Sequence, residues 1–599
     1  MTALETPAHS QPVAAPGGGF LVAPVPRAGV FTREQVSEDQ QEFADAARRF
    51  TEGEVLPRVE EIERGVKDES PVVLDLLRQA AELGLASIEL PEAYGGLGLG
   101  LTTSMLCSEA LYACASFAAT LGAHAGIGTL PIAYFGNEAQ RQAYLPQLAT
   151  AEKISCYLLT EPGNGSDALH GRTTAALSAD GTHFVLNGQK QFITNGSWAD
   201  MGVVFANIDG KYSALIVDLR APGVSRGAEE KKMGIRGSST CGLVFQDVRV
   251  PAENLLGKVG DAAKIALNIL YVGRMKLGFA TLGTTKYAID KTLEFCSSRK
   301  QFGRPVIEFD LQQGKLAEMC AWTYGTDAAC YRIVGEVDAL IAQLPAGHTP
   351  LDEIAILRRF GLECALIKVS GSETLSRVLY HALRMHGGYG FCEEYQIERL
   401  ARDNVVETIY EGTNDINRLV AGGALVENAF LGAIPFREGL AEIHASLRAG
   451  ALEPAATGDL LAGEEVRLTR LKRGLAFACE RVLLATGKDI KKEQQVTVSL
   501  VDSLMQLYVA ESAFARTVQA GACPLARVRQ DLTRLLLLEA EREVPARCRD
   551  ALSGVGDEGA RADLERLLGA PAPTCDGLSV AALRRRAAEH FILTGRYDL

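Results

Sequence analysis

The sequence predicts a multidomain α+β protein in which helical domains lie on either side, in chain order, of a middle antiparallel β domain. Two observations support this prediction. The chain has 599 residues, far more than one compact core accommodates. Its apolar residues recur at three- and four-residue spacing, change to a period of two between Cys156 and Pro251, and return to helical spacing after Leu255.

The N-terminal part divides into a tail and a helical domain. Residues 1–36 are rich in Pro, Gly and Ala and show no periodicity, so we predict a flexible tail. The tail lacks the basic start and apolar core of a signal peptide, and we therefore expect a cytoplasmic protein. Residues 37–155 have helical spacing and include the glycine-dense turn PEAYGGLGLG.

Three further domains follow along the chain. In residues 156–255, stretches such as HFVLNGQKQFIT alternate or run apolar between Gly, Asn and Asp, which is typical of antiparallel strands. Residues 256–426 contain helical stretches long enough for a helical bundle. Residues 427–599 are again helical but more charged, and they predict an appended domain.

Composition excludes several classes of function. With 47% hydrophobic and 23% charged residues, the chain has the composition of a globular protein. Its net charge of −13 argues against nucleic acid as a partner. The best apolar runs, such as Ile265–Val272, are too short to cross a bilayer. The 13 cysteines include no CxxC pair and the nine histidines are dispersed, so we predict reduced thiols and no metal site.

One stretch of the appended domain suggests a surface role. VRLTRLKRGLAFACERVLL sets basic residues beside a leucine-rich face. A basic amphipathic helix of this kind can lie on an anionic membrane, which would make the protein peripheral to a membrane. The alternative is a helix packed on its own domain with exposed arginines. The basic residues are Arg467, Arg470, Lys472 and Arg473.

The segment CYLLTEPGNGSD, residues 156–167, carries the first chemical signal. An apolar strand ends in a hydroxyl and a carboxylate and then opens into Gly163, Gly165 and Ser166. Such a loop exposes backbone N–H groups to an anion, although a structural hairpin explains the same residues equally well. LNGQKQFITNG follows it, and RKQFG, MHGGYGF and ETIYEGTNDINR occur in the helical part.

Taken together, these motifs resemble the acyl-CoA dehydrogenase family. The resemblance extends from about residue 37 to residue 423 through PEAYGGLG, TEPGNGSD, GQKQFITNG, KKMGIRGS, DVRVPAENLLG, SRKQFG, HGGYGF and YEGTND, in family order. LGAHAGIGTLPI and the appended domain are most similar to the very-long-chain branch. The resemblance implies an N-terminal helical domain, a middle antiparallel β-barrel-like domain and a C-terminal four-helix bundle, with FAD between the last two.

Carried over residue by residue, the resemblance implies a flavin site. Tyr157, Leu159 and Thr160 would lie against the flavin ring, Ser166 would bond the pyrophosphate, and Phe192 stands where many relatives have Trp. Arg299 and Phe302 would reach the FAD of a neighbouring subunit, so the site implies a homodimer or a dimer of dimers. The implied cofactor-binding residues are Tyr157, Leu159, Thr160, Gly165, Ser166, Phe192, Thr194, Arg299, Phe302, Arg384, Gly387, Gly388, Thr413 and Asp415.

Arg384 departs from the family pattern, which usually has Gln before x-x-G-G-x-G. A guanidinium at this position can pair with the FAD diphosphate or turn to solvent. Both interpretations remain open.

The catalytic prediction rests on Glu411 of IYEGTND. Oxidation of a saturated thioester requires a base for the α-proton while the β-carbon gives a hydride to flavin N5. Glu411 matches the family's base, and the residues after it, Gly412 to Asp415, favour a loop that projects the carboxylate. Some relatives place the base earlier, at the position matched by Gly273, and glycine cannot abstract a proton.

The resemblance also implies a set of substrate contacts. Arg274 aligns with an arginine that helps hold the substrate, although an arginine on a helix surface is an equally good interpretation. Gly122, Gly126 and Gly128 recur in an apolar helical segment, where close helix packing competes with a tunnel for a long acyl tail. The implied substrate-binding residues are Gly122, Ser166, Arg274 and Gly412.

The leading hypothesis is an FAD-dependent dehydrogenase that oxidises acyl-CoA to trans-2-enoyl-CoA. The resemblance implies fatty acid β-oxidation, long-chain substrates and an electron-transfer flavoprotein as the acceptor. An acyl-CoA oxidase shares the scaffold and the base but passes electrons to oxygen. A non-catalytic assembly or scaffold protein on the same fold is the rival from another class.

Overall fold

A computed structural model describes residues 14–67, 71–570 and 577–599. The chain forms two compact units. The β-containing unit comprises residues 38–276 and 344–358, and the helical unit comprises the described parts of residues 1–37, 277–343 and 359–599. Helix α8 (Ala262–Ser298) contributes residues to both units.

The β-containing unit begins with short helices, as the spacing of apolar residues predicts. Asn137 caps the last of them: its side chain accepts the Gln140 N–H, and the Gln140 side chain bonds back. The Gln140 amide also donates to the carbonyls of Glu253 and Leu255, which ties the helix to the end of the β domain. The helices are α1 (Glu38–Phe50), α2 (Val59–Arg64), α3 (Val72–Glu82), α4 (Leu101–Leu111), α5 (Ala115–Gly122), α6 (Leu130–Phe135), α7 (Glu138–Ala149) and α10 (Pro350–Arg359).

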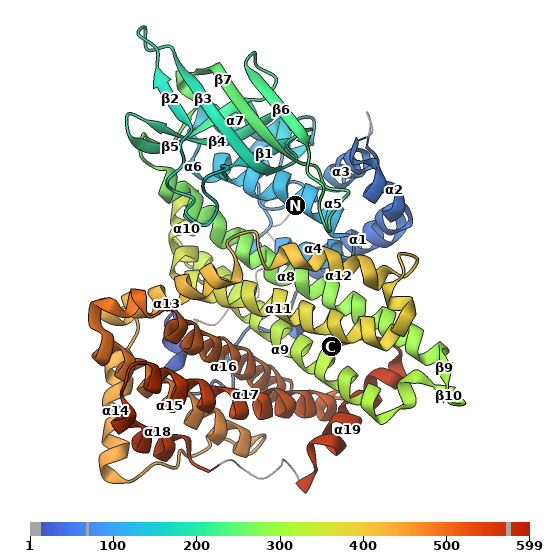
Figure 1. Cartoon of the computed structure of the whole chain (residues 1–599), viewed down its shortest axis with the longest axis vertical. Helices are drawn as coiled ribbons and strands as arrows, with labels where there is room; N and C mark the ends of the chain where they lie inside the picture. The colour runs from blue at the N-terminus through green and yellow to red at the C-terminus, as the bar shows by residue number, and fades with distance from the viewer. Residues whose placement is uncertain (1–13, 68–70, 571–576) are drawn as a thin grey trace. The chain divides into compact units, whose positions relative to one another are not determined.

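The middle domain is a sheet whose order is β6-β7-β3-β2-β4-β5-β8, with β1 also paired to β4 (Figure 1). β1 and β2 pair with β4 in parallel, so the sheet is mixed and not wholly antiparallel as predicted. Alternation of side chains does not specify strand direction, and the stretches of chain that separate β1 and β2 from β4 are longer than hairpin turns. The strands are β1 (Ser155–Leu158), β2 (Thr174–Leu177), β3 (His183–Thr194), β4 (Met201–Ile208), β5 (Lys211–Asp218), β6 (Val224–Glu229), β7 (Thr240–Pro251) and β8 (Leu255–Leu256).

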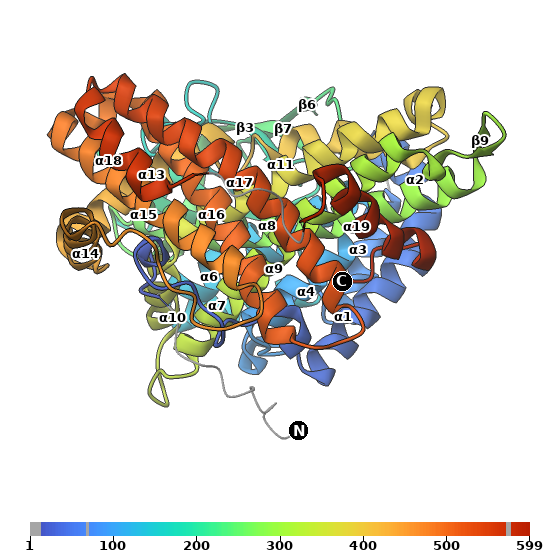
Figure 2. The same cartoon turned by 90° about the horizontal axis from the view of Figure 1, so that it is seen from below.

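The helical unit contains the predicted bundle and the helices appended to it. α16 and α17 run side by side, and α9 packs against α11 and α16 (Figures 1 and 2). A short hairpin joins α8 to α9. The elements after α8 are β9 (Lys300–Gln301), β10 (Arg304–Pro305), α9 (Asp310–Ile341), α11 (Gly361–His386), α12 (Gln396–Glu407), α13 (Asn414–Leu431), α14 (Phe436–Ala449), α15 (Ala462–Thr486), α16 (Gln494–Ala520), α17 (Ala526–Gly554), α18 (Arg561–Leu568) and α19 (Val580–Thr594).

The appended helices share a core with the bundle. Buried side chains of α8, α9 and α11 form one cluster with Ala513 of α16, Leu532 of α17 and Phe591 of α19. The predicted domain boundary between residues 426 and 427 falls inside α13. Periodicity detects helices but not which of them share a core, so the boundary differs from the prediction.

Residues 14–36 also differ from the flexible tail that their composition predicts. The side chains of Phe20, Leu21 and Val30 are at most 2% exposed. The N–H groups of Gly17 and Gly18, both at positive φ, donate to the Glu363 carboxylate on α11. A few large apolar residues and a glycine turn therefore suffice to dock a Pro- and Gly-rich segment. The part of the predicted tail before residue 14 lies outside the described residues.

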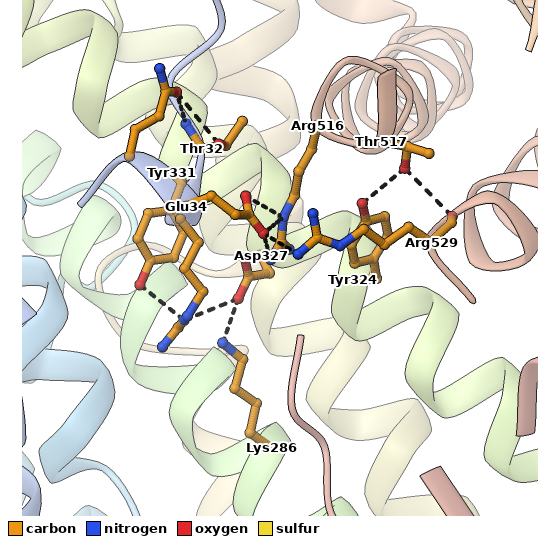
Figure 3. A network of polar contacts seen from close by, with 11 residues as sticks. Thr32, Glu34, Lys286, Tyr324, Asp327, Tyr331, Arg516, Thr517 and Arg529 are labelled. Carbon is orange, nitrogen blue, oxygen red and sulfur yellow. Dashed lines mark hydrogen bonds and ion pairs between the residues drawn. The ribbon is translucent and has the colours of Figure 1, made fainter. Parts of the chain in front are cut away.

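A charge network anchors this N-terminal segment (Figure 3). The fully buried carboxylate of Asp327 on α9 contacts Arg33, Lys286 and Arg516. Glu34 pairs with Arg516 at 2.8 Å and with Arg529 at 2.7 Å. Burial by itself raises the pKa of Glu34, but the two guanidinium groups hold it at about 2. Glu34 thus remains charged and links the segment to α16 and α17.

The basic residues of α15 do not form the surface that a membrane helix requires. Lys472 is 3% exposed and pairs with Glu511. Arg467 pairs with Glu541 at 3.6 Å, and Arg470 pairs with Glu453. These ion pairs favour the alternative of a helix packed on its own domain, and the expected membrane contact stays a prediction.

Two global features complete the description. By length and composition, α8 is the one helix among the described residues that is apolar enough to cross a membrane, and 72% of its most apolar window is buried. The cysteines within the described ranges are free thiols, all buried except Cys392 and Cys523.

Candidate active site

The loop between α12 and α13 presents Glu411 in a constrained backbone conformation. Glu411 has φ +56° and Gly412 has φ +84°, both in the left-handed region. A residue with a side chain pays about 1–3 kcal/mol for such a conformation, and strain of this kind collects at functional sites. The Glu411 side chain is half-buried. The loop therefore holds a carboxylate in a geometry that a relaxed turn does not give.

Neighbouring residues hold this loop in place. The Asn417 amide donates to the carbonyls of Gly412 at 2.6 Å and Thr413 at 3.1 Å, and approaches that of Glu411 at 3.4 Å. Thr413 caps α13, because its hydroxyl accepts the Ile416 N–H. The sequence places Asp415 in this loop, but α13 already begins at Asn414 and Asp415 is exposed in its first turn.

Gly273 and Arg274 lie on α8, in the part that belongs to the β-containing unit. The Arg274 side chain is 4% exposed, and its guanidinium carbon lies 5.9 Å from the centre of the Tyr271 ring. An arginine on the helix surface, the alternative that the sequence left open, is therefore wrong.

The loop after β1 is fixed at one end and open in the middle. The Glu161 carboxylate accepts the N–H groups of Arg172 at 2.6 Å and Thr173 at 3.1 Å, and the Lys190 ammonium at 2.7 Å. Gly165 and Ser166 are exposed, and no atom lies within 4 Å of where a Gly163 or Gly165 side chain would begin. The geometry leaves backbone groups of the loop accessible to a bound anion.

A second strand end lies beside this loop. The Gln191 N–H donates to the Thr160 carbonyl at 3.0 Å. This hydrogen bond places the end of β3, with Phe192 and Thr194, beside the loop after β1. Phe192 has φ +57° and is 62% exposed, whereas Tyr157 and Leu159 are buried and Thr160 and Thr194 are half-buried. The structure thus brings the two predicted flavin segments of this unit together.

The glycines of LGAHAGIG divide into two kinds. A Cβ at Gly128 would lie 2.5 Å from the Ser155 hydroxyl, which is close packing. At Gly122 and Gly126 a Cβ would meet no atom within 4 Å. Gly126 lies in a π-helical turn, Ala123–Gly128, that directly follows Gly122 at the end of α5. Close packing explains Gly128, whereas Gly122 is exposed and a side chain at Gly122 or Gly126 would meet no neighbour.

Among the predicted residues of the helical unit, Arg299 lines a cavity near the end of α11. Arg299, at the end of α8, lies with its guanidinium carbon 5.2 Å from the centre of the Tyr389 ring. Both residues line an open cavity of about 510 Å³ with Phe295, which stacks on His386. Gly387 ends α11 with φ +61°, and neither it nor Gly388 has an atom near its Cβ position. Phe302, in the β9–β10 turn, has φ +51° and is 93% exposed.

Arg384 turns away from this group. Its side chain is exposed, and its guanidinium carbon lies 4.9 Å from the centre of the Tyr380 ring. It does not line the cavity beside Arg299. Exposure in a single chain is compatible both with solvent and with the diphosphate of an FAD at a second subunit, so both interpretations of this residue stay predictions.

Sequence reasoning missed the residues that support the loops. Lys190, Asn195 and Asn417 are each at most 1% exposed. Lys190 and Asn417 donate to the carbonyls of Leu159 and Gly412 in the motif segments, and Asn195 donates to the carbonyl of Thr120, directly before LGAHAGIG. Lys190 and Asn195 lie inside the motif GQKQFITNG, and Asn417 lies two residues after the end of YEGTND. The sequence signal that could have found these residues is a polar side chain inside an apolar strand or near the start of a helix, because a buried polar group needs hydrogen-bond partners.

Comparison with known proteins identifies three family models along the chain. Residues 37–152 match the N-terminal domain of acyl-CoA dehydrogenases, residues 156–248 the middle domain, and residues 262–425 the C-terminal domain. Together these matches span more than half of the chain.

Similar proteins cover the chain more completely. It is 40% identical to a probable acyl-CoA dehydrogenase of Bacillus subtilis, over 90% of this chain and 91% of the relative. It is 32% identical to the mitochondrial very long-chain specific acyl-CoA dehydrogenase of Bos taurus, over 82% and 78%. A crystal structure of an acyl-CoA dehydrogenase complexed with FAD from Bacillus anthracis superimposes with a TM-score of 0.93, at 38% identity, over 98% of this chain and 100% of that one.

Proposed function

The chain belongs to the acyl-CoA dehydrogenase family of FAD-binding flavoenzymes, and from this premise we propose that Glu411 is the base for α,β-dehydrogenation of an acyl-CoA thioester. The observation that carries the proposal is the left-handed backbone of Glu411 on a loop that Asn417 holds at three carbonyls. The product would be a trans-2-enoyl-CoA.

The chemistry needs a base opposite a two-electron acceptor. The carboxylate of Glu411 takes the α-proton, which is weakly acidic beside the thioester carbonyl. Bound FAD supplies the acceptor for the hydride that leaves the β-carbon, so that a C=C bond forms and the electrons balance. The family places its base at one of two positions, which are matched here by Gly273 and Glu411. Gly273 has no group that takes a proton, so Glu411 is the carboxylate at these two positions.

The residues present fit FAD. Gly163, Gly165 and Ser166 leave an accessible loop of the kind that accepts a pyrophosphate, and Thr160 and Thr194 offer half-exposed hydroxyls beside it. Phe192 presents an exposed aromatic face that can stack on a planar ring.

We further propose a homodimer. Arg299, Phe302, Gly387 and Gly388 match family residues that reach the FAD of a neighbouring subunit. Phe302 and Phe391 are 93% and 89% exposed in the single chain, as expected of aromatic side chains that a second copy covers. Mass in solution distinguishes a dimer from a dimer of dimers.

Long-chain acyl-CoA is the proposed substrate class. The similarity to the bovine very long-chain enzyme supports it, and a Cβ at exposed Gly122 or buried Gly126 would meet no atom within 4 Å. Gly122→Leu should slow turnover of a C16 substrate about tenfold more than that of a C8 substrate, because the longer tail alone reaches the obstruction. Gly53 lies in another π-helical turn with open space at its Cβ, so Gly53→Leu is the matched control and should leave the C16/C8 ratio unchanged.

The proposed setting is cytoplasmic fatty acid β-oxidation with an electron-transfer flavoprotein as the electron acceptor. Membrane contact is not part of the proposal, because Arg467, Arg470 and Lys472 are paired inside the helical unit. An oxidase would produce peroxide under air at the rate of substrate oxidation. A scaffold protein would show no flavin reduction by substrate.

The direct test is anaerobic titration of the purified protein with saturated acyl-CoAs of increasing chain length. The proposal expects a bound flavin whose visible absorbance bleaches on addition of substrate, with a preference for long chains. It expects reoxidation by an electron-transfer flavoprotein to be faster than reoxidation by air. A flavin-loaded protein that no acyl-CoA reduces would contradict the proposal.

A further inference from the structure

A buried lysine bonds the loop that carries Glu411. Lys368 lies on α11 and is 1% exposed. Its ammonium donates to the Gly412 carbonyl at 3.0 Å and to the Asn414 side-chain oxygen at 2.7 Å. Because burial of an ammonium is costly unless it makes hydrogen bonds, these two bonds define where the loop sits on α11. Both acceptors belong to residues within three positions after Glu411 in the chain.

A line of polar contacts continues from Asn414 to the appended helices. The Asn414 amide donates to the Ser372 hydroxyl at 3.0 Å and to a Glu373 carboxylate oxygen at 3.2 Å. Glu373 pairs with Arg418 at 2.8 Å, and Arg418 pairs with Asp502 of α16 at 2.6 Å. All of these residues belong to the helical unit.

The inner and outer parts of this line differ in exposure. Lys368 and Asn414 are 1% and 7% exposed. Glu373, Arg418 and Asp502 line an open polar cleft of about 210 Å³. Solvent weakens charge interactions at the cleft but not at the buried end, so the contacts of Lys368 contribute more to loop geometry than those of Asp502.

We propose that Lys368 is a positioning residue for Glu411, and that the ion pairs Glu373–Arg418–Asp502 extend this support to α16. The inference rests on the proposed role of Glu411 as the base. The left-handed conformation of Glu411 must be held by its surroundings, and loss of the bond to the Gly412 carbonyl lets the loop relax. A misplacement of about 1 Å in a catalytic group can cost about 100-fold in rate.

The first test replaces the lysine while keeping its length. Lys368→Met in the FAD-loaded enzyme should slow flavin reduction by acyl-CoA about 30-fold while the dissociation constant for acyl-CoA changes less than about threefold. Lys368→Arg should recover part of the rate, because it keeps a charged donor. The pH profile of flavin reduction should also shift in Lys368→Met, since the surroundings of the base change.

Lys472→Met is the matched control. Lys472 is another buried lysine of the helical unit, and it pairs with Glu511 rather than with the loop. This variant should lose thermal stability but keep the rate of flavin reduction. Equal loss of rate in both lysine variants, or a Lys368→Met enzyme within about twofold of the wild type, would overturn the inference.

A second pair of variants tests the outer contacts and does not depend on how well Lys368→Met folds. Asp502→Asn and Arg418→Gln should each slow flavin reduction about threefold, and together no more than either alone, because they break the same line of contacts. Glu539→Gln is the control. Glu539 lines the same cleft and pairs with Arg377, so its replacement should leave the rate of flavin reduction unchanged. Unchanged rates in Asp502→Asn, in Arg418→Gln and in the double variant would refute the extension to α16.

Glu411→Gln in parallel separates the two proposals. If this variant still reduces its flavin, the proposed function fails. If it does not, while Lys368→Met behaves as the wild type, the positioning role alone fails.

Discussion

The loop after β1 and the loop before α13 are both held by a buried lysine, but the two lysines end on different groups. Lys190 contacts the Leu159 carbonyl at 3.3 Å and the Glu161 carboxylate at 2.7 Å. Lys368 contacts the Gly412 carbonyl and the Asn414 side-chain oxygen. An ion pair with Glu161 holds the first loop, whereas Lys368 holds the second through hydrogen bonds to two neutral oxygens.

The difference predicts what each loop loses with its lysine. Removal of Lys190 leaves the Glu161 carboxylate, whose side chain is 5% exposed, without its cationic partner. A buried charge that loses its partner costs much more than a neutral group that loses one hydrogen bond. Removal of Lys368 releases a carbonyl and an amide. The first lysine thus supports the fold of the proposed cofactor loop, and the second supports the geometry of the proposed catalytic loop.

The largest effect expected from this comparison is that of Lys190→Met. The variant should lose about 3–5 kcal/mol of unfolding free energy and most of its FAD, because Glu161 is left buried and unpaired. Denaturant unfolding and flavin absorbance measure the two effects. The double variant Lys190→Met/Glu161→Gln should recover part of the stability, since the stranded charge is gone. A Lys190→Met protein as stable as the wild type would break the comparison.

A smaller effect is expected when the acidic partner of the ion pair, Glu161, is replaced by a neutral amide. Glu161→Gln gives Lys190 an amide oxygen like the one that Lys368 has, and should cost about 1–3 kcal/mol. Burial lowers the pKa of Lys190 to about 8 even though Glu161 opposes this, so the lysine should deprotonate more readily in the variant. The measurement is the pH dependence of unfolding. A loss equal to that of Lys190→Met would show that the charge on Glu161 has no special role.

The third prediction concerns Glu363, which is held by the N–H groups of Gly18 and Gly17 instead of by a lysine. Burial raises the pKa of Glu363 to about 7 from an ordinary value of 4.5, although these N–H groups oppose the shift. A carboxyl whose pKa is higher in the folded state disfavours folding once it ionises. Docking of residues 14–36 should therefore weaken as the pH rises from 4.5 to about 7, and then remain constant.

Hydrogen exchange of residues 14–36 at about pH 5 and about pH 7.5, corrected for the intrinsic rates, measures this effect. Glu363→Gln should remove the pH dependence, because an amide does not titrate. Glu34, whose pKa is held at about 2, does not titrate in this range. An unchanged pH dependence in Glu363→Gln would show that another group is responsible.

Sequence reasoning predicted the order of helical and β regions and the motif that carries Glu411, because periodicity and glycine-rich loops are local signals. It did not predict the parallel pairing of β1 and β2 with β4, which depends on long connections. It also treated residues 14–36 as flexible, although their contacts are with Glu363, Asp327 and Arg516, hundreds of residues away. The contacts of Lys190 and Lys368 are tertiary and leave little trace in spacing.

The central claim is that the constrained loop presents Glu411 as the base. The most direct measurement is the rate of anaerobic flavin reduction by a saturated acyl-CoA in FAD-loaded Glu411→Gln, with acyl-CoA binding measured on the same sample. The account predicts unchanged FAD content, acyl-CoA affinity within about threefold of the wild type, and reduction at least about 100-fold slower, because the amide keeps the shape but removes the basic oxygen. Reduction near the wild-type rate would contradict it.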